Sequence, residues 1–468
     1  ESRPDWCISR QRSWGVPIPA FYDEEGTGHL DAGVIRAIAG KVETDGTNLW
    51  YTKTADEILE SVELPASWQG KKLTSGTDTL DVWIDSGSSH FAVLKNDENL
   101  AWPCDLYLEG SDQHRGWFQS SLWTGVIRER VAPYKTILTH GFIVNQDGTK
   151  LSKSEGAMTL EHYLDKFGSD IVRLWIASTD FRNDVPMGEE ILKTIGEAYR
   201  LLRNTYRFQI SNLFDFKIEQ HGMPIQELHE LDRWALDKTS VLTEACEQAY
   251  ERYEFHRVYQ LCNQFCSVTL SALYHDILKD RLYTLAEEHN LRRSSQTAIY
   301  HIFRTLVRVL GPILPFTSDE AWSYFISDHD FVDEPLPLQG WPTESSKWRN
   351  SELESEFTTL LDFRNSVNEK LEELRKEGAI GRSLDAFIEL SGHESDPTFS
   401  LLSKYQNFLE ELFIVSQVTL KTSGNGGMKI KVTKADGGRC PRCWRWFPNL
   451  QKAVDNDQLC PRCAEAIL

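Results

Sequence analysis

Apolar and polar residues alternate in three short runs within the first third of the chain. Residues 80–85 (LDVWID) and 105–109 (DLYLE) each end at a turn containing Gly and Ser, and residues 136–144 (TILTHGFIV) end at Asn-Gln-Asp-Gly. Alternation bounded by turn residues predicts β-strands. A helix-like run begins near Asp112, directly after the second strand. Strand, tight turn and helix indicate an α/β domain, whose ligands bind at the carboxyl ends of the strands.

From about residue 188 the apolar period becomes that of α-helices. One stripe consists of Val258, Leu261, Phe265, Val268 and Ala272, and a second consists of Phe357, Leu360, Val367, Leu371 and Leu374. Both predict helices with one buried face. Thr317 and Glu320 have the spacing of a capping box and predict the start of another helix. A Gly/Ser/Asn stretch at residues 423–427 then leads to a cysteine-bearing tail.

The composition is that of a folded, acidic protein. The 468 residues hold 50 Lys and Arg against 70 Asp and Glu, which gives a formal net charge of −20, and 15 Trp can fill several cores. A chain of this length is expected to form about three domains. No run approaches about 18 apolar residues and no basic, apolar leader is present, so we expect a cytoplasmic protein without a membrane span. The acidic balance disfavours non-specific coating of nucleic acid but permits local basic patches.

Four of the nine cysteines form two pairs in the tail. Cys440 and Cys443 are separated by two residues, as are Cys460 and Cys463, and sixteen residues lie between the pairs. This spacing predicts a four-cysteine zinc ribbon holding one tetrahedral ion, with two disulfides or free thiols as the alternatives. Four thiolates leave no open coordination position, so the zinc is expected to be structural. The remaining cysteines, which we expect to be reduced core residues, are Cys7, Cys104, Cys246, Cys262 and Cys266.

The same tail is locally basic. Its Lys and Arg residues are Lys429, Lys431, Lys434, Arg439, Arg442, Arg445, Lys452 and Arg462, and they outnumber the Asp and Glu residues around them. Trp444, Trp446 and Phe447 stand among the arginines. Such a mixture suits phosphate contact and stacking on unpaired bases, which favours RNA binding. An aromatic mini-core with a solvated basic face is the alternative.

Two further segments carry polar groups that suit catalysis. Residues 150–156 (KLSKSEG) follow the third predicted strand, and the ammonium groups of Lys150 and Lys153 could gather triphosphate oxygens and stabilise a transferring phosphoryl group. Residues 109–118 (EGSDQHRGWF) follow the second strand, where carboxylates can hold an ammonium group or ribose hydroxyls and Trp117 can wall an apolar pocket. A basic surface loop and satisfied core side chains are the respective alternatives.

Together these segments resemble a class I aminoacyl-tRNA synthetase, and within that class the isoleucyl-tRNA synthetases of the bacterial type. KLSKS is similar to the KMSKS motif of the class, and EGSDQHRGWF to the block that lines the isoleucyl-adenylate site. Further matches are ISRQRSWGVPIP, DVWIDSGSSH, FGSDIVRLW and ILPFTSDEAW, followed by the zinc ribbon. The resemblance covers nearly the whole chain.

The resemblance implies roles for the matching residues. Lys150 and Lys153 would be catalytic, with Lys153 bound to the ATP phosphates. The adenylate pocket would be formed by Glu109, Asp112, Gln113, Trp117 and His140. The zinc ligands would be Cys440, Cys443, Cys460 and Cys463. ATP with Mg²⁺, L-isoleucine and tRNA(Ile) would be the substrates, and we expect a monomer.

The resemblance also predicts the organisation of the chain. The family's His-Ile-Gly-His motif and its editing insert do not occur in these residues, which begin with Glu1, so we expect the C-terminal portion of a synthetase that is inactive alone. The predicted parts are the second half of a Rossmann-like catalytic domain (1–187), a helical-bundle anticodon-binding domain (188–345), a mixed junction domain (346–425) and a zinc-binding domain (426–468). A non-catalytic RNA-binding module and a valyl- or leucyl-type synthetase are the alternatives.

Overall fold

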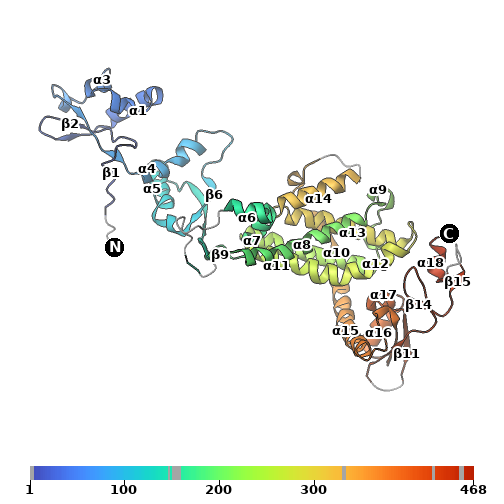
Figure 1. The fold of residues 1–468 in the computed structure, drawn as a ribbon. Coiled ribbons are helices and arrows are strands. Elements are labelled where there is room, and N and C mark those ends of the chain that lie inside the picture. The colour runs from blue at the N-terminus through green and yellow to red at the C-terminus, as the bar shows by residue number, and fades with distance from the viewer. Residues whose placement is uncertain are drawn as a thin grey trace. The chain divides into compact units, whose positions relative to one another are not determined.

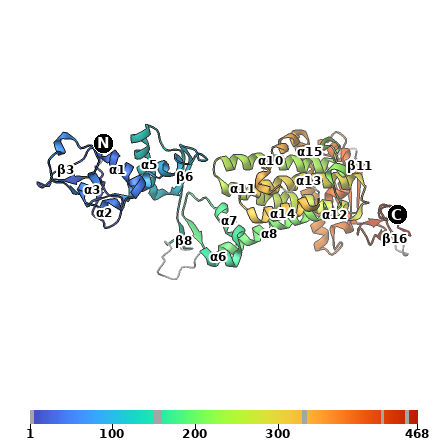
Figure 2. The same ribbon diagram turned by 90° about the horizontal axis from the view of Figure 1, so that it is seen from above.

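The computed structural model describes residues 5–145, 148–149, 160–328, 334–423, 427–452 and 458–467. The chain divides into two units, one made of residues 1–142 with 182–184 and the other of residues 143–181 with 185–468. Figures 1 and 2 show the helices and strands of each unit.

The first unit begins with a small antiparallel sheet and short helices. The carboxylate of Asp31 accepts hydrogen bonds from the backbone nitrogens of Gly33 and Val34 and so caps the first helix. Phe21 and Trp50 lie in the apolar core between sheet and helices. The elements are β1 (Ser9–Arg10), β2 (Phe21–Tyr22), β3 (Gly28–His29), α1 (Ala32–Asp45), α2 (Leu49–Thr52), α3 (Ala55–Leu59), η1 (Ala66–Trp68), β4 (Thr74–Ser75) and β5 (Thr79–Leu80). β2 pairs with β3 and β4, and β1 with β5.

The α/β region of the first unit follows. Its elements are α4 (Val82–Gly87), the π-helical η2 (His90–Leu94), β6 (Cys104–Gly110), the 3-10 turn η3 (Ser111–Arg115), α5 (Trp117–Glu129) and β7 (Tyr134–His140). β6 and β7 run parallel, with Glu109 opposite Thr139 and Gly110 opposite His140. The predicted strand at residues 105–109 and the helix after Asp112 are confirmed, and the two strands end at the same edge.

The predicted strand at residues 80–85 is wrong. Only Leu80 belongs to a strand, and α4 begins directly after Asp81, whose carboxylate accepts a hydrogen bond from the Trp83 nitrogen at 3.1 Å. Asp is among the preferred N-cap residues. The cap therefore starts a helix that the alternating pattern does not indicate.

The second unit is mainly helical. α8, α10 and α13 lie side by side in its centre (Figures 1 and 2), around one continuous apolar core. The elements up to residue 348 are β8 (Ile143–Asn145), α6 (Leu160–Phe167), α7 (Ser169–Ser178), β9 (Val185–Met187), α8 (Glu189–Ser211), α9 (Ile218–His221), η4 (Ile225–Glu227), α10 (Glu230–Glu251), α11 (Phe255–Gln264), the π-helical η5 (Phe265–Tyr274), α12 (His275–Thr284), α13 (Asn290–Leu310), α14 (Pro315–Asp328), η6 (Leu336–Leu338) and η7 (Thr343–Trp348). β8 pairs with β9, so the third predicted strand is in fact two strands, β7 and β8.

The apolar stripe predicted from Val258 to Ala272 keeps one face only as far as Phe265. Val258 and Phe265 are buried, whereas Val268 is 59% exposed and Ala272 is also exposed. α11 passes into the π-helical segment η5 at Phe265. A π-helix bonds residue i to i+5, so side chains three or four positions apart no longer share a face.

The capping box predicted at Thr317 and Glu320 is also wrong. α14 begins earlier, at Pro315, and the backbone nitrogen of Thr317 donates to Asp170 Oδ2 of α7 at 2.7 Å. Glu320 instead forms an ion pair with Arg203 of α8 at 3.1 Å. A tertiary partner thus takes the place of the local cap.

A long helix leads to a mixed three-stranded sheet. In α15 (Ser351–Lys376) the predicted stripe is confirmed, since Phe357, Leu360, Val367 and Leu371 are buried. The following elements are η8 (Ser383–Asp385), β10 (Ala386–Gly392), α16 (Pro397–Lys404), α17 (Leu409–Phe413), β11 (Gln417–Thr422) and β12 (Lys429–Lys434). β10 lies between β11, to which it is parallel, and β12, to which it is antiparallel.

The cysteine-bearing tail forms a small module of its own, which we call the zinc module (residues 436–467). Its described elements are β13 (Gly438–Arg439), β14 (Trp446–Phe447), β15 (Gln451–Lys452), β16 (Gln458–Leu459) and α18 (Pro461–Glu465). β13 pairs with β14 and β15 with β16, so each hairpin ends beside one cysteine pair.

Within the described residues, no helix has the length and apolar character needed to cross a membrane.

Candidate functional site

Glu109 and His140 lie next to each other at the carboxyl ends of β6 and β7. Glu109 Oε2 is 3.8 Å from His140 Nε2 and accepts a hydrogen bond from the Gly110 nitrogen at 2.8 Å. His140 Nδ1 lies 2.8 Å from the carbonyl oxygen of Gly141, which can only accept, so this nitrogen carries the proton. The Glu109 side chain is 51% exposed. The edge of the sheet therefore presents a carboxylate that can receive an ammonium or hydroxyl group.

Gln113 shapes the turn between β6 and α5. Its Oε1 accepts a hydrogen bond from the Trp117 nitrogen at 3.1 Å, and its amide nitrogen donates to Asp112 Oδ2 at 3.1 Å. Gly116 makes this turn possible, because a Cβ there would lie 2.7 Å from Gln113 Oε1 and 2.8 Å from the Trp83 ring. Gln113 thus acts on the backbone of the turn, and Asp112 stands exposed beside it.

Trp117 is held in place by two contacts. Its indole nitrogen donates to the carbonyl oxygen of Ser86 at 3.0 Å, and its ring stacks on Tyr107 of β6 with centroids 4.3 Å apart and an interplanar angle of 7°. The side chain therefore ties α5 to β6 and to the end of α4.

A cavity of about 250 Å³ lies beside Gly116, and three tryptophans line it. The lining residues are Asp5, Trp6, Trp83, Arg115, Gly116, Gln119, Ser120 and Trp123. Trp117, which the sequence suggests as the pocket wall, is not among them. Trp83 belongs to the DVWIDSGSSH segment and Trp6 stands two residues before ISRQRSWGVPIP, so both could have been singled out on that ground, whereas Trp123 carries no motif.

Lys150 and Lys153 lie outside the described residues, as does the rest of residues 150–159. Their predicted role in binding the ATP phosphates stays a prediction.

The four predicted zinc ligands come together. The sulfur atoms of Cys440, Cys443, Cys460 and Cys463 all lie within 4.8 Å of one another and are buried. The Cys443 and Cys460 sulfurs are 3.8 Å apart. In a tetrahedron with zinc–sulfur bonds of about 2.3 Å, two sulfurs are about 3.8 Å apart. The four cysteines fit one structural zinc ion.

The other cysteines are only partly as predicted. Cys246, Cys262 and Cys266 are buried free thiols in the helical core, but Cys7 is exposed and Cys104 is half-buried.

Three arginines of the zinc module point toward the helices rather than into solvent. Arg442 donates to the carbonyl oxygen of Thr284, at the end of α12. Arg462 donates to both carboxylate oxygens of Asp280, at 2.6 and 2.8 Å, and Arg445 pairs with the same carboxylate at 3.4 Å. The sequence-based view of the tail's arginines as one RNA-facing set is therefore wrong for these three.

Trp444, in contrast, is 52% exposed, and two other arginines lie near its ring. The guanidinium carbons of Arg382 and Arg439 are 5.4 and 5.7 Å from its ring centroid. Its backbone has a φ of 66°. This left-handed conformation turns the chain sharply after Cys443. Together Trp444, Arg382 and Arg439 form a surface that we call the Trp444 platform.

The two remaining aromatics of the tail serve the alternative role, an aromatic mini-core. The Trp446 indole nitrogen donates to Asp385 Oδ1 at 3.0 Å, and Phe447 packs against the cysteine cluster.

Three family comparisons match successive parts of the chain. Residues 1–188 match the class I tRNA synthetases (I, L, M and V), residues 232–390 the anticodon-binding domain of tRNA ligase, and residues 437–466 the zinc finger found in FPG and IleRS. The chain belongs to the class I aminoacyl-tRNA synthetases. The third match agrees with the four converging cysteines, so the predicted zinc site is confirmed.

Among the class I synthetases, the relatives most similar in sequence that we compared are isoleucine–tRNA ligases. The isoleucine–tRNA ligase of Syntrophotalea carbinolica is 43% identical over 477 residues, covering 100% of this chain and 51% of the relative. That of Methylacidiphilum infernorum is 44% identical over 470 residues, covering 100% of this chain and 50% of the relative. The resemblance to isoleucyl-tRNA synthetases is thereby confirmed. The chain spans about half the length of these curated relatives.

A solved structure supports the fold. The LeuRS of Agrobacterium radiobacter, in a ternary complex with tRNA and LeuAMS, matches with a TM-score of 0.52 and 16% identity, over 90% of this chain and 51% of that one. The predicted architecture, an α/β catalytic half with an all-α domain and a small zinc ribbon, is confirmed at the level of fold.

Proposed function

We propose that the protein to which this chain belongs is an isoleucine–tRNA ligase. In the first step the carboxylate of L-isoleucine attacks the α-phosphorus of ATP, and pyrophosphate leaves. A ribose hydroxyl of tRNA(Ile) then attacks the acyl carbon, and AMP leaves. The supporting observation is that Glu109 and His140 lie together at the carboxyl ends of two parallel strands, with Asp112 in the turn that follows the first of them. Ligands of α/β sheets bind at this edge.

The residues divide the work by chemistry. Glu109 binds the adenylate, and Asp112 and His140 add polar groups to the same edge. Gln113 and Trp117 act mainly by holding the turn, as their backbone and ring contacts suggest. Lys150 and Lys153 bind the phosphates of ATP, which enters with Mg²⁺. No enzyme nucleophile is required, because positioning and charge stabilisation suffice for such transfers.

The test of this function is amino-acid-dependent exchange of labelled pyrophosphate into ATP. For the complete protein we expect exchange with isoleucine that exceeds exchange with valine or leucine. Preference for either of those amino acids would favour the valyl- or leucyl-type alternative. No exchange with any amino acid, together with retained tRNA binding, would favour the non-catalytic RNA-binding module.

The 468 residues alone should show no such exchange. They contain no His-Ile-Gly-His motif, whose histidines hold ATP in this family. The expected result is a rate at the background of the exchange assay, whereas the same preparation still binds tRNA in a filter assay. Measurable isoleucine-dependent exchange would contradict this expectation.

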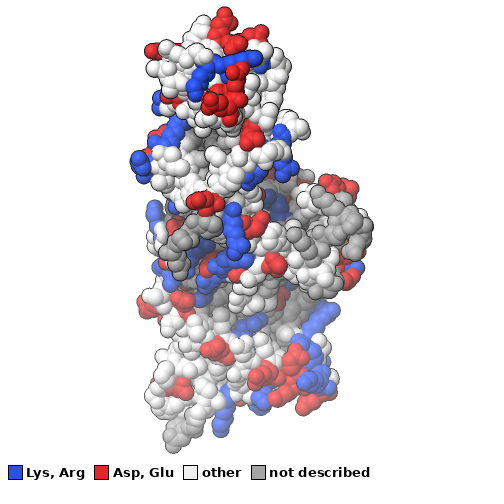
Figure 3. Space-filling view, turned by 90° about the vertical axis from the view of Figure 1, so that its left-hand side faces the viewer, with Lys and Arg blue, Asp and Glu red and all other residues white. Residues whose placement is uncertain are grey.

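The zinc module offers a surface that could contact the tRNA. The net charge of the chain is −20, and on the face drawn in Figure 3, which does not display the zinc module, acidic and basic side chains are interspersed. RNA contact therefore depends on local groups rather than on a general basic field. We assign this contact to the Trp444 platform, since an exposed indole can stack on a base and the two guanidinium groups near it can hold a phosphate.

Trp444→Ala should weaken tRNA binding by about 2 kcal/mol, roughly thirtyfold, because one base loses its stacking partner. The measurement is filter binding of tRNA(Ile) at several salt concentrations. Arg382→Gln should also weaken binding and reduce the salt slope by about one unit, because one phosphate contact is lost. Phe447→Leu is the matched control, since that ring packs against the cysteines. Unchanged binding in the Trp444 variant would remove the platform from the interface.

The proposal extends to the cellular compartment of the protein and to its oligomeric state. We place the protein in the cytoplasm, because four zinc-binding thiolates suit a reducing compartment. We propose that it acts as a monomer.

A further inference from the structure

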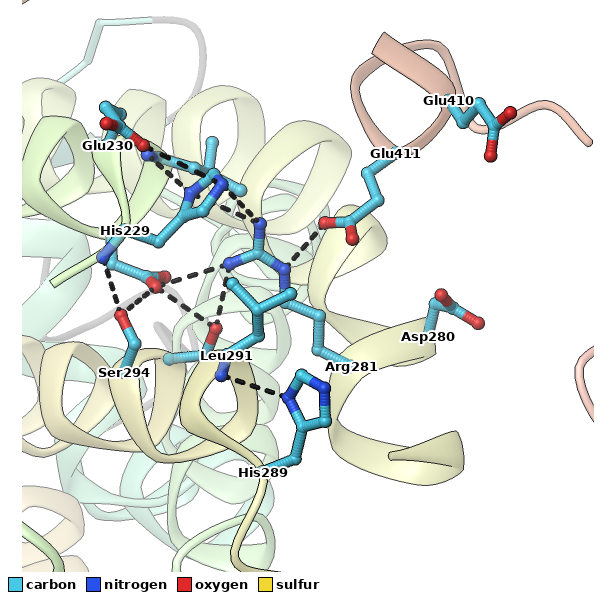
Figure 4. A network of polar contacts seen from close by, with 12 residues as sticks. His229, Glu230, Asp280, Arg281, His289, Leu291, Ser294, Glu410 and Glu411 are labelled. Carbon is cyan, nitrogen blue, oxygen red and sulfur yellow. Dashed lines mark hydrogen bonds and ion pairs between the residues drawn. The ribbon is translucent and has the colours of Figure 1, made fainter. Parts of the chain in front are cut away.

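Arg281 of α12 lies wholly buried at the centre of a polar network (Figure 4). It donates to Glu411 Oε2 of α17 at 2.7 Å and to Asp232 Oδ2 of α10 at 3.3 Å. Ser294 of α13 donates to the same Asp232 oxygen at 2.6 Å. Burial and the charge of Arg281 lower the pKa of His229 to about 3, so its neutral ring can accept from the guanidinium. The network fixes α12 among the helices and against α17.

Asp280, the preceding residue, faces the other way. In Figure 4 the Arg281 side chain enters the network, and the Asp280 carboxylate points away from it. Glu410 and Glu411 of α17 are arranged in the same manner, since Glu411 reaches Arg281 and Glu410 pairs with Arg445 of the zinc module at 3.5 Å. Each pair of neighbours therefore joins the helical network on one side to the zinc module on the other.

The arginines that contact Asp280 and the end of α12 occupy matching positions in the two cysteine pairs of the zinc module, which we call its knuckles (residues 440–443 and 460–463). Arg442 stands between Cys440 and Cys443, directly before the second ligand, and Arg462 occupies the same place between Cys460 and Cys463. A cysteine bound to zinc fixes the backbone beside it. The ion therefore determines the direction in which both guanidinium groups leave the module.

The surface that receives them is made of oxygen atoms, because the one basic residue in the last turn of α12, Arg281, faces the buried network instead. α12 ends at Thr284, so its last carbonyl groups and Asp280 together make the C-terminal turn electronegative. Arg442 satisfies the Thr284 carbonyl, and Arg462 forms a two-pronged pair with Asp280. Such forked pairs fix orientation as well as adding binding energy.

We propose that the two knuckles form a zinc-dependent latch, in which the bound ion orients Arg442 and Arg462 so that they hold the zinc module against Asp280 and Thr284 of α12. The latch goes beyond the proposed ligase function and does not depend on it. Asp280 is a positioning residue for the zinc module and contacts no substrate. Loss of the ion should free the end of α12, and loss of Asp280 should free the module while the ion stays bound.

Hydrogen exchange of the intact chain, followed by mass spectrometry together with elemental analysis for zinc, tests both directions. In Asp280→Asn we expect one zinc per chain, as in the wild type, and exchange in α18 at least about tenfold faster, since a charge-assisted hydrogen bond contributes about 1.5–3 kcal/mol. In the wild type, removal of zinc by a chelator should accelerate exchange in the last turn of α12 and leave α13 unchanged. Asp276→Asn, which affects an exposed pair with Lys279 on the same helix, is the matched control and should behave as the wild type.

Arg462→Gln repeats the test from the zinc module without altering α12. It should also accelerate exchange in α18, and the double variant should fall short of the sum of the two single effects, because both single variants lose the pair between Asp280 and Arg462. The latch would be overturned if the exchange rate of α18 were unchanged in either variant. It would also be overturned if the removal of zinc left the exchange rate of the last turn of α12 unchanged. The loss of zinc from Asp280→Asn would overturn it as well, since the carboxylate would then belong to the metal site.

Discussion

Cys460→Ser should abolish zinc binding and unfold the zinc module. The wild-type chain should contain about one zinc ion, and the variant none, because a serine hydroxyl replaces one of four converging thiolates. Structural zinc contributes about 10–16 kcal/mol in small zinc-finger peptides, far more than a module of this size can supply from its own core. Elemental analysis and the exchange rates of the backbone amides in residues 438–467 measure the two effects.

The rest of the second unit should survive this substitution. The cysteine cluster and its few apolar neighbours form a core separate from that of the helices. The thermal transition of the helices should therefore shift little, and Cys7→Ser, at an exposed cysteine, should change neither zinc content nor stability. Zinc retained by Cys460→Ser, or a metal-free wild type with disulfides, would refute the assignment of these residues as ligands.

Features with short sequence spacing were predictable in this chain. Each cysteine pair is separated by two residues, so its knuckle geometry follows from local chain stiffness and ligand chemistry. The end of β6 was predictable for a similar reason, since alternation stops at Gly110 and a helix follows within a few residues. The roles of Glu109 and Lys153, in contrast, came from the resemblance to a family, because a carboxylate or a lysine in a turn has no specific meaning alone.

Features that depend on distant partners were not predictable. Arg442, Arg445 and Arg462 have the composition of an RNA-binding patch, yet their partners Asp280 and Thr284 stand more than a hundred residues away in the sequence. Arg382 carries no motif, and only the fold brings it to Trp444. The start of α14 is decided by Asp170 in the same way. Tertiary contacts replace the local preferences that sequence reasoning can assess.

The division of the tail between two tasks follows from these contacts. Three arginines are used within the chain, which leaves Arg439 of the zinc module and Arg382 of the neighbouring segment beside the exposed indole of Trp444. With three arginines of its zinc module paired internally, the chain keeps few arginines there for RNA. Its affinity for tRNA should therefore rest on a small number of phosphate contacts, each with a measurable share of the salt dependence.

In the complete protein, Lys153→Ala should slow isoleucyl-adenylate formation by about a hundredfold, on the order of 3 kcal/mol. A cation already directed at the phosphates stabilises charge that develops as pyrophosphate leaves, so kcat for isoleucine-dependent pyrophosphate exchange should fall while KM for isoleucine changes little.

Glu109→Gln should slow the same step and also raise KM for isoleucine, because this carboxylate is proposed to hold the adenylate. Binding of tRNA should be nearly unchanged in both variants. Lys166→Ala, which removes an exposed lysine paired with Glu189, is the matched control and should leave exchange as it is. Exchange in Lys153→Ala within about twofold of the wild type would exclude this lysine from the chemistry, since a catalytic cation contributes far more than that.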